Sequence, residues 1–146
     1  MSRKKMLRFV GIDYGHKRIG LAVGDTEMRI AMPVKQVDGG GDIHIDAKAV
    51  WAAVADEAVD VFVVGLPLNM DDSEGPQAAV CRNFADQLRT LSGKPVEMFD
   101  ERLTSHAAEG MLIEAELTRK KTKKRLDSVA AQLILQGYLD HHPELE

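Results

Sequence analysis

The sequence predicts an α/β fold in which helices flank a mixed five-stranded sheet. Two apolar runs without polar alternation, residues 9–12 and 61–64, have the pattern of strands covered on both faces, which is typical of parallel pairing. Residues 19–24 and 28–37 follow the first run closely and complete an antiparallel meander of three strands. Pro33 places the third strand at an edge, since proline donates no hydrogen bond to a sheet. A fifth strand is predicted over residues 96–99, parallel to the other two.

Helices are predicted wherever apolar residues recur at a spacing of three and four. The first spans residues 42–58, and the second follows a loop over residues 65–76, with Ser73 as its cap and Pro76 in its first turn. Thr104 or Ser105 is expected to cap a third helix, and the last helix has apolar residues on one face from Leu126 onward. The predicted element order is therefore β-β-β-α-β-α-β-α-α.

Length and composition predict one domain over residues 1–146, with residues 1–6 and 141–146 as flexible tails. The single cysteine, Cys81, excludes an internal disulfide and is expected in the core. No apolar stretch approaches the ~18 residues of a membrane span, and the amino end lacks the apolar segment of a signal peptide. We therefore expect a cytoplasmic protein.

The net charge of −4 conceals a local basic segment. Residues 119–125 carry six cations and no acid, which leaves a net charge of −10 on the rest of the chain. An acidic body with one basic segment indicates local contact with a polyanion, although a solvated loop has the same composition. The lysines and arginines predict a mobile loop that holds phosphates through Arg119, Lys120, Lys121, Lys123, Lys124 and Arg125.

Acidic residues stand where three predicted elements meet. Asp13 ends the first strand, Asp100-Glu101 ends the fifth, and Asp127 begins the last helix, whose Ala130 and Ala131 permit close approach to a strand. Because parallel strands share one carboxyl edge, these acids are expected to converge there. Converging carboxylates repel each other unless a cation neutralises them, and Mg²⁺ prefers such oxygen ligands. Taken singly, each acid could equally bond its own turn or lie in solvent.

Four motifs stand out along the chain. They are Gly11-Ile12-Asp13-Tyr14-Gly15 with Arg18-Ile19-Gly20 and Asp25, then Gly65-Leu66-Pro67-Leu68, then Asp100-Glu101-Arg102-Leu103-Thr104-Ser105, and finally Asp127-Ser128-Val129-Ala130-Ala131. In this order and spacing they resemble the YqgF/RuvX family of Holliday-junction-resolvase-like proteins, which are described as nucleases that process the 5′ end of pre-16S ribosomal RNA. The resemblance runs from about Leu7 to Leu139.

The resemblance implies an RNase H-like fold with Asp13, Glu101 and Asp127 as catalytic and metal-binding acids. This chain departs from the family's pattern at Asp72, where a glycine is usual. Carboxylates alone can hold a pair of Mg²⁺ or Mn²⁺ ions roughly 3.5–4 Å apart, so no histidine base is needed. Phosphate oxygens of the substrate would be neutralised or bound by Lys17, Arg18, Arg102 and Ser105, together with the basic segment.

Two rival functions share these features. The first strand and its turn also resemble the phosphate loop of actin-like ATPases and sugar kinases, but those proteins close two such domains over a nucleotide. A nucleic-acid-binding protein without hydrolysis would keep the basic segment and need no acidic triad. The sequence leaves open RNA or branched DNA as substrate, one metal ion or two, and a monomer or weak homodimer.

Overall fold

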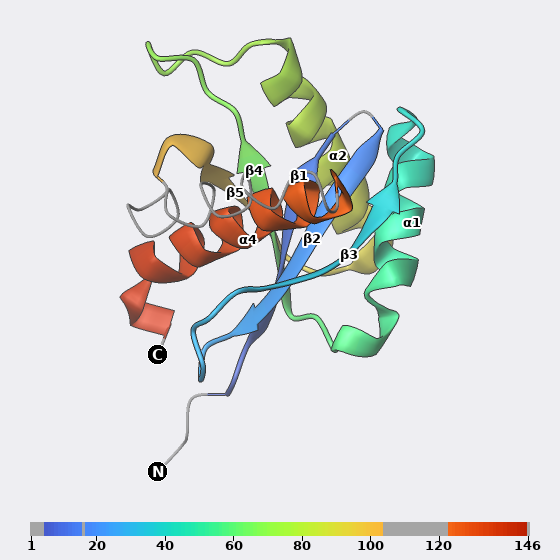
Figure 1. Cartoon of the computed structure of the whole chain (residues 1–146). Coiled ribbons are helices and arrows are strands. Elements are labelled where there is room, and N and C mark those ends of the chain that lie inside the picture. Colours follow the sequence, from blue (N-terminus) through green and yellow to red (C-terminus); the bar gives the residue numbers. More distant parts are fainter. Residues whose placement is uncertain (1–4, 16, 104–122, 146) are drawn as a thin grey trace.

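The computed structural model describes residues 5–15, 17–103 and 123–145 as one sheet between two layers of helices (Figure 1). The sheet has five strands in the order β3-β2-β1-β4-β5. Their bounds are β1 Arg8–Tyr14, β2 Arg18–Asp25, β3 Met32–Asp38, β4 Val61–Leu66 and β5 Val96–Asp100. Antiparallel pairing joins β1 to β2 and β2 to β3, while β1, β4 and β5 run parallel. The predicted topology is confirmed, including the edge position of β3.

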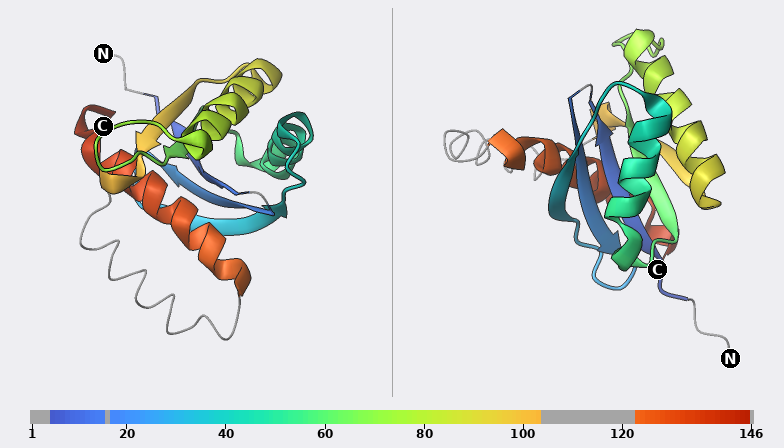
Figure 2. Two further views of the ribbon diagram at one scale, coloured as in Figure 1. Left: turned by 90° about the horizontal axis from the view of Figure 1, so that it is seen from above. Right: turned by 90° about the vertical axis from the view of Figure 1, so that its right-hand side faces the viewer.

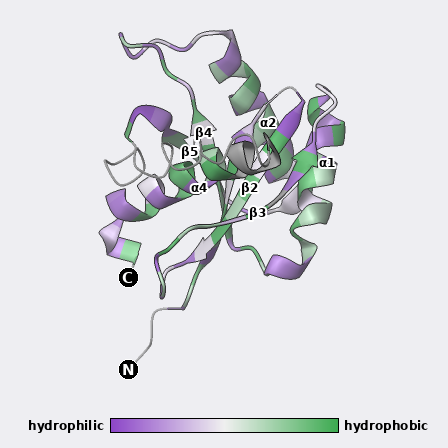
Figure 3. Ribbon diagram, in the orientation of Figure 1, coloured by the Kyte–Doolittle hydropathy of each residue, from purple (hydrophilic) through white to green (hydrophobic). Residues whose placement is uncertain are grey.

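Helices cover both faces of this sheet (Figure 2). α1 (Ile43–Ala53) and α2 (Pro76–Ser92) lie together on one face, and α4 (Lys123–His141) lies across the other. Short 3-10 turns follow three elements: η1 (Ala55–Glu57), η2 (Glu101–Leu103) and η3 (Pro143–Leu145). Hydrophobic and hydrophilic residues alternate along α2, as expected of a helix with one buried face (Figure 3).

The alternation of side chains along β1 divides the core in two. Val10, Ile12 and Tyr14 point to the face of α1 and α2, where buried Cys81 also packs, as predicted. Phe9 and the opposite side of the sheet pack against α4. Because side chains i and i+2 of a strand share a face, Gly11 and Asp13 lie on the α4 face with Phe9.

Several predicted boundaries are wrong. The first helix ends at Ala53 and not at residue 58, since the chain turns through η1 and through Ala58, whose φ is 51°. The third strand begins at Met32, because the chain first completes a turn over Asp25 and passes through Arg29 with a φ of 54°. Ser73 does not cap α2, which begins after Gly75.

Other predictions concern the ends of elements. β4 continues through Gly65 and Leu66, which the sequence placed in a loop. The helix expected after Thr104 lies outside the described residues, as do residues 119–122 of the basic segment. The last part of that segment, residues 123–125, belongs to α4 and not to a loop, because α4 begins at Lys123.

Candidate active site

Asp13 lies at the carboxyl end of β1, in the middle of the sheet. Its partner across the antiparallel pair is Gly20, and on the other side Ile12 is level with Val64 of β4. β4 in turn pairs with β5 so that Gly65 is level with Phe99 and Leu66 with Asp100. The half-buried Asp13 and the end of β5 therefore reach the same edge, separated by one strand.

The Glu101 side chain folds back over that intervening strand. A Cβ atom at Gly65 would lie 2.6 Å from Glu101 Oε1 and 2.5 Å from Ile134 Cδ1 of α4. A side chain at position 65 would have to displace the ends of Glu101 and Ile134, so the carboxylate occupies space that a glycine leaves open. Glu101 thus lies on the α4 face of β4, which is also the face to which Asp13 belongs.

α4 approaches this face closely through a second glycine. A Cβ atom at Gly11 would lie 2.6 Å from Leu135 Cβ and 2.9 Å from the Ala131 carbonyl oxygen. Asp127 lies one turn before Ala131 in α4, about 6 Å along the helix axis. The backbone of α4 therefore runs past β1 near Asp13, while the Asp127 side chain lies outside the described part of the structure.

The two neighbouring acids at the junction of β5 and η2, Asp100 and Glu101, differ in their electrostatic surroundings. Burial raises the pKa of the Glu101 carboxyl, and the negative charge of Asp100 adds to this effect. The pKa of Asp100 is lowered, chiefly because its carboxylate accepts hydrogen bonds from Arg102. Ionisation of Glu101 therefore costs free energy, whereas the negative charge of Asp100 is already balanced by Arg102.

Arg102 binds acidic and carbonyl oxygens of the protein itself. Its Nε atom donates to both carboxylate oxygens of Asp100, at 3.0 and 3.1 Å, and its Nη2 atom donates to Asp100 at 2.8 Å and Asp72 at 2.7 Å. Its Nη1 atom donates to the Asn69 carbonyl at 3.0 Å. The contacts of Arg102 with Asn69 and Asp72 were not predicted, because these residues lie 33 and 30 positions away in the sequence.

A buried hydrogen bond supports the end of β1 beneath Asp13. The Tyr14 hydroxyl donates to Asp46 Oδ2 of α1 at 2.6 Å, and the Gly40 amide donates to Asp46 Oδ1 at 2.9 Å. Asp46 is 1% exposed, and the Tyr14 ring stacks on Phe84 of α2. Burial, followed by the bond to Asp46, raises the pKa of Tyr14. The strand end that carries Asp13 is therefore tied to both helices of the opposite layer.

A second group of contacts joins α2 to the same strand end. Gln77 Nε2 donates to the Tyr14 carbonyl at 3.3 Å and lies 3.9 Å from Cys81 Sγ. Burial raises the pKa of the Cys81 thiol to about 11, and the charges of Glu101 and Asp13 contribute. Both acids therefore lie within electrostatic range of this thiol. The raised pKa makes Cys81 a neutral core residue and not a nucleophile.

The predicted phosphate-binding cations are only partly placed. Lys17 and Arg18 lie at the turn between β1 and β2, at the same edge as Asp13. The side chains of residues 123–125 lie outside the described part of the structure, although their backbone belongs to the first turn of α4. Ser105, Arg119, Lys120 and Lys121 are also outside it.

No group of three histidine, cysteine, aspartate or glutamate side chains that could hold a metal ion occurs among the described residues. Because the Asp127 side chain is not among them, the structure shows two acids of the predicted triad on one face, Asp13 and Glu101. Two half-buried carboxylates, one of which has a raised pKa, fit a divalent cation of the Mg²⁺ type. The third donor stays a prediction.

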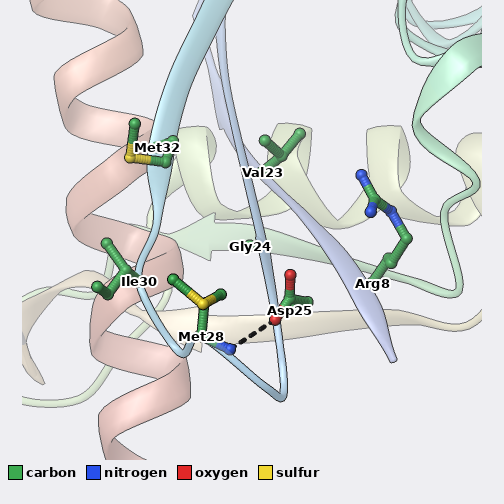
Figure 4. Close-up of a pocket in the computed structure, with 7 residues that line it drawn as sticks. All are labelled: Arg8, Val23, Gly24, Asp25, Met28, Ile30 and Met32. Carbon is green, nitrogen blue, oxygen red and sulfur yellow. Dashed lines mark hydrogen bonds between the residues drawn. The ribbon is translucent and has the colours of Figure 1, made fainter. Parts of the chain in front are cut away.

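A pocket of about 310 Å³ lies away from these acids, at the other end of the same strands (Figure 4). Arg8 and Asp25, which line it, are paired across β1 and β2 five residues before Asp13, about 17 Å away along the strand. Its other lining residues are mainly apolar, among them the exposed Met28, Ile30 and Met32. This pocket is therefore not the acidic site.

The family to which this chain belongs is shown by its sequence. The family model described as "RuvX: Holliday junction resolvase" matches residues 7–141. The chain belongs to the RuvX family. A relative from Chloroflexus aggregans is 46% identical over 131 residues, which cover 90% of this chain and 92% of the relative. A relative from Anaeromyxobacter sp. (strain Fw109-5) is 42% identical over 92% of this chain and 97% of its own length. Both bear the name "Putative pre-16S rRNA nuclease".

Solved structures confirm the RNase H-like fold of this RuvX-family chain. RuvC of T. thermophilus in complex with a Holliday junction substrate superposes with a TM-score of 0.57 at 16% identity, covering 93% of this chain and 95% of RuvC. The large terminase nuclease of phage G20c superposes with a TM-score of 0.51 at 14% identity, covering 92% and 82% of the two chains. No helix in the described ranges is long and apolar enough to span a membrane.

Proposed function

We propose that this RuvX-family chain is a divalent-metal-dependent endonuclease that hydrolyses phosphodiester bonds of structured RNA, with the 5′ end of pre-16S rRNA as its substrate. The observation that carries the proposal is the Glu101 carboxylate folded over Gly65, onto the face that Asp13 shares. Membership of this family and two carboxylates on one face of the sheet both fit metal-dependent hydrolysis of a phosphodiester bond.

Asp13, Glu101 and Asp127 would hold the cation as Mg²⁺ or Mn²⁺. When bound, such an ion activates water and stabilises the charge that develops on the phosphate oxygens. The chain itself orients the ligands. Tyr14 and Asp46 fix the end of β1, and Gly65 leaves the space into which the Glu101 carboxylate turns.

Lys17 and Arg18 lie at the edge where the substrate backbone would approach, so they would bind phosphates on the β2 side of the acids. The basic segment before Asp127 would hold the backbone further along. Contacts of this kind position a nucleic acid without reading its sequence. The shape of the RNA must therefore supply much of the selectivity.

Cleavage of a four-way DNA junction is the second candidate function, favoured by the family's description as Holliday junction resolvases. The two candidates separate in one experiment. We would incubate the protein with a pre-16S rRNA 5′ fragment and a four-way DNA junction, with Mg²⁺, Mn²⁺ or EDTA. We expect cleavage of the RNA that depends on the metal ion. Cleavage of the DNA junction alone would contradict this and favour the second candidate function.

Matched variants identify the acids responsible. Asp13→Asn and Glu101→Gln keep the side-chain shape and remove a ligand charge, so cleavage should fall by at least about 100-fold while the fold persists. Asp56→Asn is the control, because Asp56 is an exposed acid in η1, before β4, at the opposite end of the sheet. Binding without cleavage in the wild-type protein, under every metal condition, would support a non-catalytic binding protein instead.

A further inference from the structure

The Arg102 guanidinium lies between two carboxylates that belong to different elements. Asp100 ends β5, and Asp72 lies at the tip of the loop between β4 and α2. Arg102 follows Glu101 directly, so this ion cluster adjoins the candidate active site. Two negative charges therefore compete for one cation at the point where a substrate phosphate would arrive.

The two carboxylates hold Arg102 unequally. The Asp100 side chain is 18% exposed, and both its oxygens accept from the guanidinium. Its Oδ1 atom also accepts from the Arg102 amide at 3.0 Å. The Asp72 side chain is 82% exposed and contacts Arg102 through one oxygen, at 2.7 Å. Exposed ion pairs contribute little to stability, so Asp72 is the partner that a competing anion can displace.

The backbone at Asp72 is held in a conformation that favours glycine. Its φ is 70°, in the left-handed region, and its amide donates to the Asn69 carbonyl at 3.0 Å. The base of the loop is fixed separately, since Glu74 forms a two-pronged ion pair with Arg82 of α2 at 2.6 and 2.7 Å. Rotation of the Asp72 side chain alone would free one face of the Arg102 Nη2 group. Asp100 and the Asn69 carbonyl would still hold the guanidinium, and the loop would stay in place.

We propose that Asp72 occupies, in the free protein, the position on Arg102 that a phosphodiester oxygen of the substrate takes on binding. Asp100 stays in place and keeps the guanidinium oriented during the exchange. An arginine fork suits a phosphate as well as it suits a carboxylate. Asp72 then acts as an internal competitor that weakens binding of any nucleic acid that cannot place a phosphate beside Glu101. The inference rests on the proposed function, because it takes a nucleic acid as the ligand.

The neighbouring acid of the same loop supplies a matched control. Asp71 is exposed like Asp72, but it accepts hydrogen bonds from Ser73 and not from Arg102. Asp71→Asn and Asp72→Asn remove the same charge from adjacent positions. Only the second removes the competitor. Asp72→Gly is a further variant, because glycine adopts the left-handed φ without strain.

Binding is measured by fluorescence anisotropy with a labelled RNA stem–loop in EDTA, so that cleavage plays no part. We expect Asp72→Asn and Asp72→Gly to tighten binding by about two- to fivefold at low salt, and Asp71→Asn to do clearly less. In the Arg102→Gln background the effects of Asp71→Asn and Asp72→Asn should become equal. Thermal melting of each variant confirms that it is folded.

Equal effects of Asp71→Asn and Asp72→Asn in the presence of Arg102 would overturn the inference, since Asp72 would then act only through its general charge. Weaker binding by both Asp72 variants would overturn it as well, because the ion pair would then build the binding surface. Neither outcome touches the proposed hydrolysis, which is tested by cleavage with metal. Absence of cleavage beside a specific Asp72 effect would refute the hydrolysis alone.

Discussion

At the scale of single residues, ionisation of the Glu101 carboxyl costs free energy, and a bound cation would lower that cost. The pKa of this carboxyl is raised by burial, so the folded protein binds a proton there more tightly than the unfolded chain does. Stability therefore falls as the pH rises through the range in which this carboxyl ionises. We expect Glu101→Gln to melt at a higher temperature than the wild type at neutral pH without divalent ions, and to lose the stabilisation that Mg²⁺ gives. A melting temperature unchanged or lowered in EDTA would contradict this.

Gly65 is the residue whose absence of a side chain makes the site. In Gly65→Ala the new methyl group would meet Glu101 and Ile134 at 2.6 and 2.5 Å. We expect a loss of about 1 kcal/mol in the free energy of unfolding, at the low end for overpacking because both contacted atoms are ends of side chains that can shift. Cleavage should drop strongly, because the shift moves the Glu101 carboxylate. Gly40→Ala is the control, because nothing lies within 4 Å of a Cβ atom at Gly40. Urea unfolding and a cleavage assay on both variants check the prediction.

At the scale of elements, the Tyr14–Asp46 bond ties β1 to α1 through the interior. Tyr14→Phe would leave the buried Asp46 carboxylate without one donor, at a cost of about 1–3 kcal/mol in the free energy of unfolding. The raised pKa of Tyr14 makes the stability of the wild type fall as the pH rises above about 10, where the unfolded chain loses the phenol proton. The difference between the wild type and Tyr14→Phe, measured by urea unfolding, should therefore shrink above that pH. A difference that is constant with pH would show that this proton does not contribute.

The elements were predictable where a pattern is local. The unbroken apolar runs located β1 and β4, and Pro33 correctly indicated an edge strand. Boundaries depended on contacts that only the folded chain makes. α1 stops at Ala53 because the chain must turn back toward β4, although the apolar spacing continues to Ala58.

The site was predictable as a set of acids but not as a geometry. The carboxyl ends of parallel strands indicated that Asp13 and Glu101 share an edge, and both lie there. The space over Gly65 is a tertiary feature, and its one local sign was a glycine directly after an apolar run. The Asp72–Arg102 pair joins residues 30 positions apart, which no spacing rule detects.

At the scale of the whole molecule, the basic segment is expected to bind the phosphate backbone, because the rest of the chain carries a net negative charge. Replacing Lys120, Lys121, Lys123 and Lys124 by glutamine should weaken binding to all sequences alike. Each lost phosphate contact lowers the slope of log affinity against log salt by about 0.7–0.9, so the slope should flatten by up to roughly 3. Anisotropy on one RNA across a salt series measures this. An unchanged slope would place the phosphate contacts elsewhere, around Arg18 and Arg102.

The order of elements along the chain has a consequence for when the protein can act. α4 follows all the strands, and it carries Asp127 while covering Phe9, Val63 and Phe99 on its face of the sheet. During synthesis Asp13 and Glu101 emerge from the ribosome first, on a sheet whose second face is still bare. On the proposed roles, a nascent chain that lacks α4 has neither its third acid nor the helix that packs on this face of the sheet. If these roles hold, cleavage of RNA requires that α4 has been synthesised and has packed onto the sheet.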